Sequence, residues 1–117
     1  MPHMLLIIED PAQRETRSAA EGRAVYERML KFGADLKERG VLIASESLKS
    51  LKDSARLQVR GGRAQVVDGP FSEAKEMVGG FFLINCETRD EALAIAAQCP
   101  AAEWATVEVR ALAPCYE

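Results

Sequence analysis

The feature that most constrains this fold is the period of its hydrophobic residues, which changes several times along the chain. His3–Ile8 is a short aliphatic run, which is typical of a buried strand. After Ser18 the spacing becomes helical. One face of the predicted helix carries Val25, Met29, Phe32 and Leu36. This pattern predicts a helix of about five or six turns, with Ser18 and Glu21 as a capping box and Gly40 suited to end it. Val41–Ala44 then restarts an extended segment.

The clearest local signal is a pair of glycines between two alternating segments. Gly61-Gly62 separates Arg56–Arg60 from Arg63–Val67. Two glycines here predict a tight β-hairpin, because the primed turns that join such strands need positive φ angles. The register that such a loop imposes forms two apolar pairs, Leu57 with Val66 and Val59 with Ala64. The opposite face then carries Arg56, Gln58, Arg60, Arg63 and Gln65.

The second half of the chain repeats the order strand, helix, strand. Gly79-Gly80 introduces a predicted strand over Phe81–Cys86. A helix stopped by Pro100 follows, with Ala92, Ile95, Ala96 and Cys99 on one face. Thr106–Arg110 alternates apolar and charged residues, as a half-exposed strand does. Residues 1–117 are therefore expected to form one α+β domain, ferredoxin-like βαββαβ with an inserted β-hairpin.

The two helices of such a fold leave half of the sheet surface uncovered. Both helices lie on one face of the antiparallel sheet, because crossover connections are right-handed. Residues such as Phe81 or Phe82 would make the bare face apolar. A second copy covering that face would give an isologous dimer, so we expect a homodimer.

Composition excludes several classes of function. The formal net charge is −3, whereas a protein that binds nucleic acid needs a basic face. The chain has no apolar run of about 18 residues, so no membrane span is predicted. The apolar run near the start is too short for a signal peptide, and we expect a cytoplasmic protein. Three cysteines fit neither a disulfide framework nor a zinc site, and His3 is the single histidine, so no metal and no cofactor are predicted.

Two central segments carry a family resemblance. Val67–Glu76 reads Val-Asp-Gly-Pro-Phe-Ser-Glu-Ala-Lys-Glu and is followed by Gly79–Ile84. Together they resemble the signature of the DGPF family within the YCII-related proteins. The likeness extends over nearly the whole chain, to Met4–Ile7, Arg89–Ala92, Cys99–Ala101 and Val107–Arg110. It implies a ferredoxin-like α+β domain that dimerises through a barrel-like sheet interface, the dimeric α/β-barrel type.

The resemblance implies less about activity, because most of the family is uncharacterised. Some members carry a His–Asp pair proposed as catalytic, with the histidine on the first long helix, and one branch acts in dehydrochlorination of a chlorinated hydroxyquinol. Here that helix has no histidine, and Arg28 lies near the position that the histidine would take. Members often occur beside, or fused to, extracytoplasmic-function sigma factors, which implies a regulatory association.

Two interpretations of the DGPF segment remain open. In the functional one, Asp68 is a general base in a cleft, Lys75 holds an anionic substrate and Phe71 lines the pocket. In the structural one, Asp68 caps its own turn, Phe71 fills the core and Lys75 is solvated. Arg28 and Arg56 are further candidates for ligand binding, since guanidinium groups bind acidic groups through paired hydrogen bonds. Arginines on a hairpin are also commonly solubilising.

Two functions are compatible with these observations. The first is a domain that binds an unknown small molecule in a cleft near the DGPF segment, with metal-free acid–base chemistry of the lyase or dehydrochlorinase type. It predicts a pocket between sheet and helix. The second is a non-catalytic dimeric regulatory or protein-interaction module, linked to sigma-factor systems, and it predicts a filled interior. Whether any reaction is catalysed stays open at this point.

Overall fold

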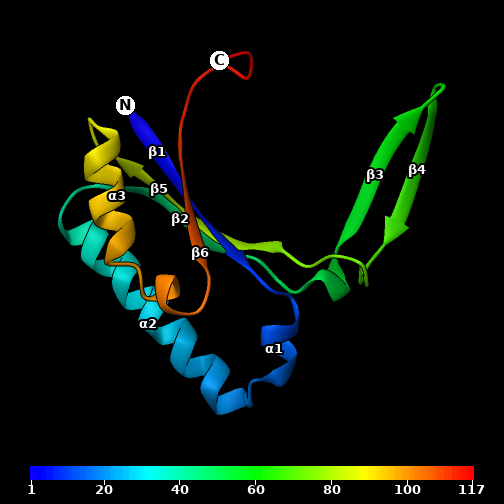
Figure 1. Cartoon of the computed structure of the whole chain (residues 1–117), viewed down its shortest axis with the longest axis horizontal. Helices are drawn as coiled ribbons and strands as arrows, with labels where there is room; N and C mark the ends of the chain where they lie inside the picture. Colours follow the sequence, from blue (N-terminus) through cyan, green and yellow to red (C-terminus); the bar gives the residue numbers. More distant parts are fainter.

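The computed structural model describes residues 1–117 as a sheet covered by helices, with a separate two-stranded hairpin (Figure 1). The elements in chain order are β1 (Pro2–Glu9), α1 (Ala12–Thr16), α2 (Ala19–Glu38), β2 (Leu42–Ser47), η1 (Leu51–Asp53), β3 (Ala55–Arg60), β4 (Arg63–Asp68), β5 (Met77–Asn85), α3 (Arg89–Ala97), η2 (Pro100–Glu103) and β6 (Thr106–Ala111). The strand order of the main sheet is β2-β5-β1-β6, and every neighbouring pair is antiparallel. This confirms the α+β class and is compatible with a ferredoxin-like arrangement.

The ends of α2 are fixed by the residues that the sequence indicates. The Ser18 hydroxyl accepts a hydrogen bond from the Glu21 amide, as an N-cap residue does. At the other end Gly40 has a φ of 75°. The Val41 amide then donates to the Leu36 carbonyl, which completes a Schellman motif.

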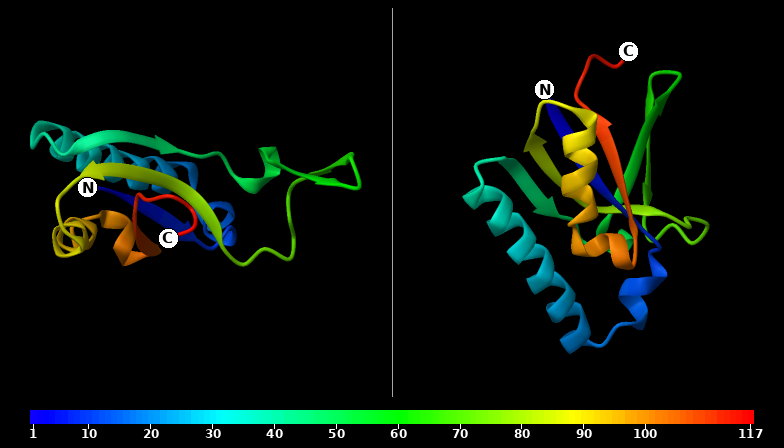
Figure 2. Two further views of the ribbon diagram at one scale, coloured as in Figure 1. Left: turned by 90° about the horizontal axis from the view of Figure 1, so that it is seen from above. Right: turned by 60° about the vertical axis from the view of Figure 1, so that its left-hand side comes forward.

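The face of the sheet that the helices cover contains the core. Along β1 the buried residues alternate with half-buried ones, so that Leu5 and Ile7 point toward the helices. They belong to one cluster with Leu36 of α2 and Ile95 of α3. Both helices therefore cover the same face, as expected (Figure 2).

The opposite face of the main sheet is uncovered by helices. It is apolar along the central strands β1 and β5, whereas the edge strands β2 and β6 add Glu46, Glu108 and Arg110 to it. Phe82 pairs with Leu5 and lies on the helix-covered face, whereas Phe81 pairs with Leu6 and lies on the opposite one. We call this second surface the open face. Its apolar side chains are Met4, Leu6, Ile8, Val78, Phe81 and Leu83.

The β3–β4 hairpin has the predicted register and stands away from the main sheet. Leu57 pairs with Val66 and Val59 with Ala64. All residues of both strands are exposed. Figure 1 shows the hairpin extending on the side of the sheet away from α2 and α3.

Three details differ from the sequence-based expectations. Strand β5 begins at Met77, so that Gly79-Gly80 lies within it and does not precede it. Strand β2 continues to Ser47, beyond the predicted Ala44. The short helix α1 was not expected at all. No helix of the chain is both long enough and apolar enough to cross a membrane.

Candidate ligand-binding cavity

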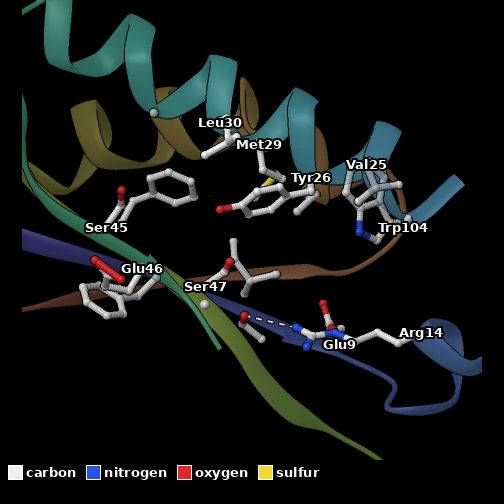
Figure 3. Close-up of a pocket in the computed structure, with 18 of the residues that line it drawn as sticks. Glu9, Arg14, Val25, Tyr26, Met29, Leu30, Ser45, Glu46, Ser47 and Trp104 are labelled. Carbon is white, nitrogen blue, oxygen red and sulfur yellow. Dashed lines mark hydrogen bonds and ion pairs between the residues drawn. The ribbon is translucent and has the colours of Figure 1, made fainter. Parts of the chain in front are cut away.

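A cavity of about 700 Å³ lies between α2 and the main sheet. It falls within the size range of pockets for small organic ligands. The helix side of the cavity is mainly apolar, with Val25, Tyr26, Met29 and Leu30, and it also includes Lys37. Figure 3 shows these side chains opposite the sheet, with Trp104 at one end.

The cavity exists because α2 packs on the sheet only near its C-terminus. Its buried residues are Phe32, Gly33 and Leu36, and the preceding turns contribute none. The Phe32 and Phe82 rings meet edge to face, with centroids 5.0 Å apart. From this contact the helix diverges from the sheet toward its N-terminus, as the right-hand view of Figure 2 shows.

The floor of the cavity holds a buried ion pair. Glu9 continues the inward-facing row of β1 past Ile7, and its side chain is only 7% exposed. Arg14 of α1 donates from Nε to Glu9 Oε1 over 2.6 Å. The same guanidinium donates to the carbonyls of Leu48 (2.6 Å) and Gly79 (3.2 Å). A buried carboxylate without such a partner would cost several kcal/mol, on the order of its desolvation energy.

Gly79 of β5 makes room for this ion pair, and its neighbour Gly80 makes room for the main chain of β2. Ile7 pairs with Gly80 and Ile8 with Val78, so Gly79 is the extra residue of a β-bulge. A Cβ on Gly79 would lie 2.7 Å from Glu9 Oε2, and one on Gly80 would lie 2.8 Å from the Glu46 carbonyl oxygen. The glycines therefore allow close approach inside the strand. The sequence-based expectation that they mark its start was wrong for this reason.

Trp104 closes the end of the cavity next to α1. The Trp104 carbonyl accepts a hydrogen bond from Gln13 Nε2 at 2.8 Å, which ties α1 to η2. Its ring lies below the guanidinium groups of Arg17 and Arg28, at 5.8 and 5.4 Å from the ring centroid. Gln13 Oε1 is buried without a hydrogen-bond partner.

The DGPF residues lie at the base of the hairpin and do not line this cavity. Asp68 is exposed at the end of β4. Phe71 is buried, and the Arg56 guanidinium carbon lies 3.8 Å from the centroid of its ring. The Gly69 amide donates to the Ser54 carbonyl, and a Cβ on Gly69 would overlap the Leu51 carbonyl oxygen. In this arrangement the segment joins the hairpin to η1.

The other two predicted ligand-binding residues, Lys75 and Arg28, lie near Trp104. Lys75 borders a second, more open cavity of about 380 Å³ that also includes Glu9 and Glu103. Arg28 forms an exposed ion pair with Glu103. The structure thus brings Arg56 to Phe71, but it does not gather Asp68, Lys75 and Arg28 into one site.

A second pair of buried polar groups lies at the other end of β1. His3 Nδ1 is 3.1 Å from the Met1 carbonyl oxygen and 3.3 Å from Cys86 Sγ. Burial raises the pKa of the Cys86 thiol, and the nearby Glu91 carboxylate acts in the same direction. The thiol is therefore held protonated, which makes it a poor nucleophile. No group of three or more His, Cys, Asp or Glu side chains is arranged to hold a metal ion.

Comparison with known proteins identifies the family. The YCII-related domain matches residues 1–115 of the chain. This chain is a YCII-related protein. It is similar to an uncharacterised protein of Rhizobium meliloti (strain 1021), with 33% identity over 115 residues, 97% of this chain and 93% of the relative. The predicted family of this YCII-related protein is thereby confirmed.

Sequence reasoning missed the ion pair at the cavity floor, although one signal was available. Glu9 follows His3, Leu5 and Ile7 at intervals of two, so it had to share their buried face. A carboxylate on a buried face calls for a partner. The sequence does not indicate that Arg14 is this partner, because the contact depends on how α1 folds back against the main sheet.

Proposed function

We propose that this YCII-related protein binds a small organic molecule in the cavity between α2 and the main sheet, and that it does so as a homodimer. The observation that carries the first part is the cavity itself, with its apolar helix wall and a buried ion pair on its floor. Such a combination of apolar lining and few convergent polar groups is typical of ligand sites. It favours ligand binding over a purely regulatory module, for which a filled interior was expected.

A fragment screen followed by amide chemical shifts tests the cavity. We expect two-ring fragments to shift the amide signals of Tyr26, Leu30 and Ser45, which line it. Gly22 also lines the cavity, and a Cβ added there meets nothing within 4 Å. Gly22→Phe should therefore fill the space and weaken binding at least about tenfold, which is about 1.4 kcal/mol.

The matched control for this variant is Arg23→Phe. Arg23 is exposed on the same helix turn and does not line the cavity. It should leave binding unchanged. Fragment shifts confined to other parts of the molecule, or equal losses in both variants, would contradict the proposal.

Acid–base chemistry without a metal is a further part of the proposal, supported by the family resemblance. Asp68 was the predicted base, and its carboxylate is exposed at the hairpin base. A role for it requires a substrate that reaches the hairpin. Asp68→Asn measures this role, and unchanged ligand binding and unchanged turnover in that variant would count against it.

The homodimer is supported by two apolar surfaces on one side of the chain. The first is the open face of the main sheet. The second is the apolar side of the hairpin, where Leu57, Val59 and Val66 are 63, 55 and 58% exposed. Clustered apolar side chains that stay exposed commonly mark an interaction surface. Sheet-to-sheet packing of two copies would cover the first, and each hairpin would reach over its partner.

Charge also favours a second copy as the occupant. The hairpin carries Arg56, Arg60 and Arg63 against the single carboxylate of Asp68, whereas the whole chain has a net charge of −3. The rest of the chain is therefore more acidic than the whole, and a basic hairpin is complementary to it.

Leu6→Glu tests the dimer. Leu6 is central on the open face, so a buried carboxylate there should give a folded monomer in sedimentation at micromolar concentration. Leu93→Glu is the control, because Leu93 is 39% exposed on α3, on the helix side. A single-chain mass for the unmodified protein would overturn the dimer.

A further inference from the structure

The Glu9 carboxylate has one oxygen that the chain leaves without a partner. Oε1 accepts from Arg14, but no donor of the protein reaches Oε2. The one fully buried side-chain atom that lacks a hydrogen-bond partner is Gln13 Oε1. Because Glu9 Oε2 also lacks a partner but is not such an atom, it keeps some contact with solvent. In Figure 3 the carboxylate lies beside the Arg14 guanidinium, with an oxygen directed toward the α2 side chains.

Arg14 uses three of its five N–H donors within the chain. Its Nε, Nη1 and Nη2 groups each donate to Glu9, Leu48 or Gly79. The guanidinium is thus held by two main-chain carbonyls and one carboxylate. We assign it as a positioning residue that fixes the direction of Glu9 and balances its charge.

The surroundings of Oε2 define what can approach it. Gly79 lies against it on the sheet, and any side chain there would displace the carboxylate. The opposite wall is formed by apolar side chains, among them Met29 and Leu30. A ligand that fills the cavity therefore has a largely apolar body. It also needs one hydrogen-bond donor, because Glu9 Oε2 would otherwise lose its contact with water without gaining a partner.

We infer that Glu9 Oε2 accepts a hydrogen bond from an uncharged hydroxyl or N–H group of a largely apolar ligand. The inference rests on the proposed function of the cavity and specifies its ligand class. A carboxylate ligand has no hydrogen to donate, so it would place one acceptor against another at Oε2. A cationic ligand gains little, because Arg14 already neutralises Glu9 at 2.6 Å.

The test compares three probes of nearly the same shape, with binding followed by amide shifts of the cavity residues. Indole presents an N–H donor, 1-methylindole lacks it, and quinoline presents an acceptor. With the unmodified protein we expect indole to bind about tenfold more tightly than 1-methylindole, which is the difference that a hydrogen bond to a charged acceptor typically gives. Quinoline should bind no better than 1-methylindole.

Glu9→Gln should reverse this preference. The amide keeps the shape and one acceptor for Arg14 Nε, and it presents an NH₂ donor where Oε2 was. Quinoline should then bind better than indole. If the variant fails to fold, the comparison of indole with 1-methylindole on the unmodified protein still decides the matter.

The outcomes separate the inference from the proposal that it rests on. Equal binding of indole and 1-methylindole in the cavity overturns the role of Glu9 and leaves the cavity as a ligand site. Probe shifts that avoid the cavity altogether overturn both. Tighter binding of indole-3-carboxylate than of indole, with shifts at Glu9, overturns the uncharged ligand class.

Discussion

The two ends of α2 face the same sheet in different ways. Toward the C-terminus, Phe32, Gly33 and Leu36 are buried against β5 and the rest of the core. Toward the N-terminus, the residues from Ala19 to Lys31 are exposed or half-buried, and one side of this stretch borders the cavity. A single helix thus has a packed end that stabilises the fold and an open end that is available to a ligand.

Two glycines within α2, Gly33 and Gly22, show the difference between the packed end and the open end. A Cβ on Gly33 would lie 3.3 Å from the Phe82 ring, whereas a Cβ on Gly22 would meet nothing within 4 Å. At the packed end, glycine lets the helix approach the sheet. At the open end, it leaves volume in the cavity. The same residue type therefore serves contact in one place and space in the other.

The largest expected effect comes from a cavity created at the packed end. Leu36 is fully buried, at 0% exposure. Leu36→Ala should lower the free energy of unfolding by about 2–5 kcal/mol, because it removes buried methyl groups and leaves a void. Urea unfolding followed by circular dichroism measures this change.

Leu30→Ala is the matched variant at the open end. Leu30 is 53% exposed and borders the ligand cavity. Its loss should cost less than about 1 kcal/mol of stability, and it should weaken fragment binding. Similar destabilisation by both substitutions would mean that the two ends of α2 do not differ as described.

The second prediction concerns the thiols of the core. Cys86 and Cys99 are buried, while Cys115 is exposed. Burial raises the pKa of both buried thiols above the ordinary value of 9.0. At pH 8 a thiol reagent should therefore modify Cys115 alone in the folded protein and all three thiols in urea.

The sign of the pH dependence follows from the same shifts. The folded state keeps these two thiols protonated, whereas the unfolded chain releases their protons from about pH 9 upward. Stability should be unaffected by these groups below that pH and should fall as the pH rises through the folded pKa values. Native Cys86 or Cys99 reacting as fast as Cys115 would contradict this assignment.

Much of the fold could be predicted from the sequence because it is encoded locally. The hydrophobic period identified the main strands and helices, and the register of the hairpin followed from Gly61-Gly62. The cap at Ser18 was also readable, since its side chain accepts from the Glu21 amide three residues later.

The cavity could not be predicted in this way, because it depends on the angle between α2 and the sheet. The Phe32–Phe82 contact holds the C-terminal part of α2 on the sheet, and α1, which precedes the helix, is tied to Trp104 through Gln13. Asp68 was predicted as a catalytic residue because it belongs to the DGPF motif. The glycine of that motif, Gly69, packs against the Leu51 carbonyl of η1. Sequence motifs mark positions with strict backbone requirements as readily as they mark sites of chemistry.

The smallest expected effect compares the two glycines of α2 directly. Gly22→Ala should raise the free energy of unfolding by about 0.5–1 kcal/mol, because alanine favours the helix and limits the unfolded chain. The new methyl group meets no neighbour. Gly33→Ala has the same gain in helix propensity, but its methyl group crowds Phe82, which is itself buried in the core.

The difference between these two variants is the sensitive measure of how closely α2 packs at each end. Paired urea titrations at one protein concentration should give a higher midpoint for Gly22→Ala and an unchanged or lower one for Gly33→Ala. An equal gain in stability for both variants would mean that Phe82 can move aside without loss of stability. The packed end of α2 would then accommodate a methyl group as easily as the open end. Because alanine occupies little of the cavity, Gly22→Ala should also retain fragment binding, which separates the effect of helix propensity from the loss of volume in Gly22→Phe.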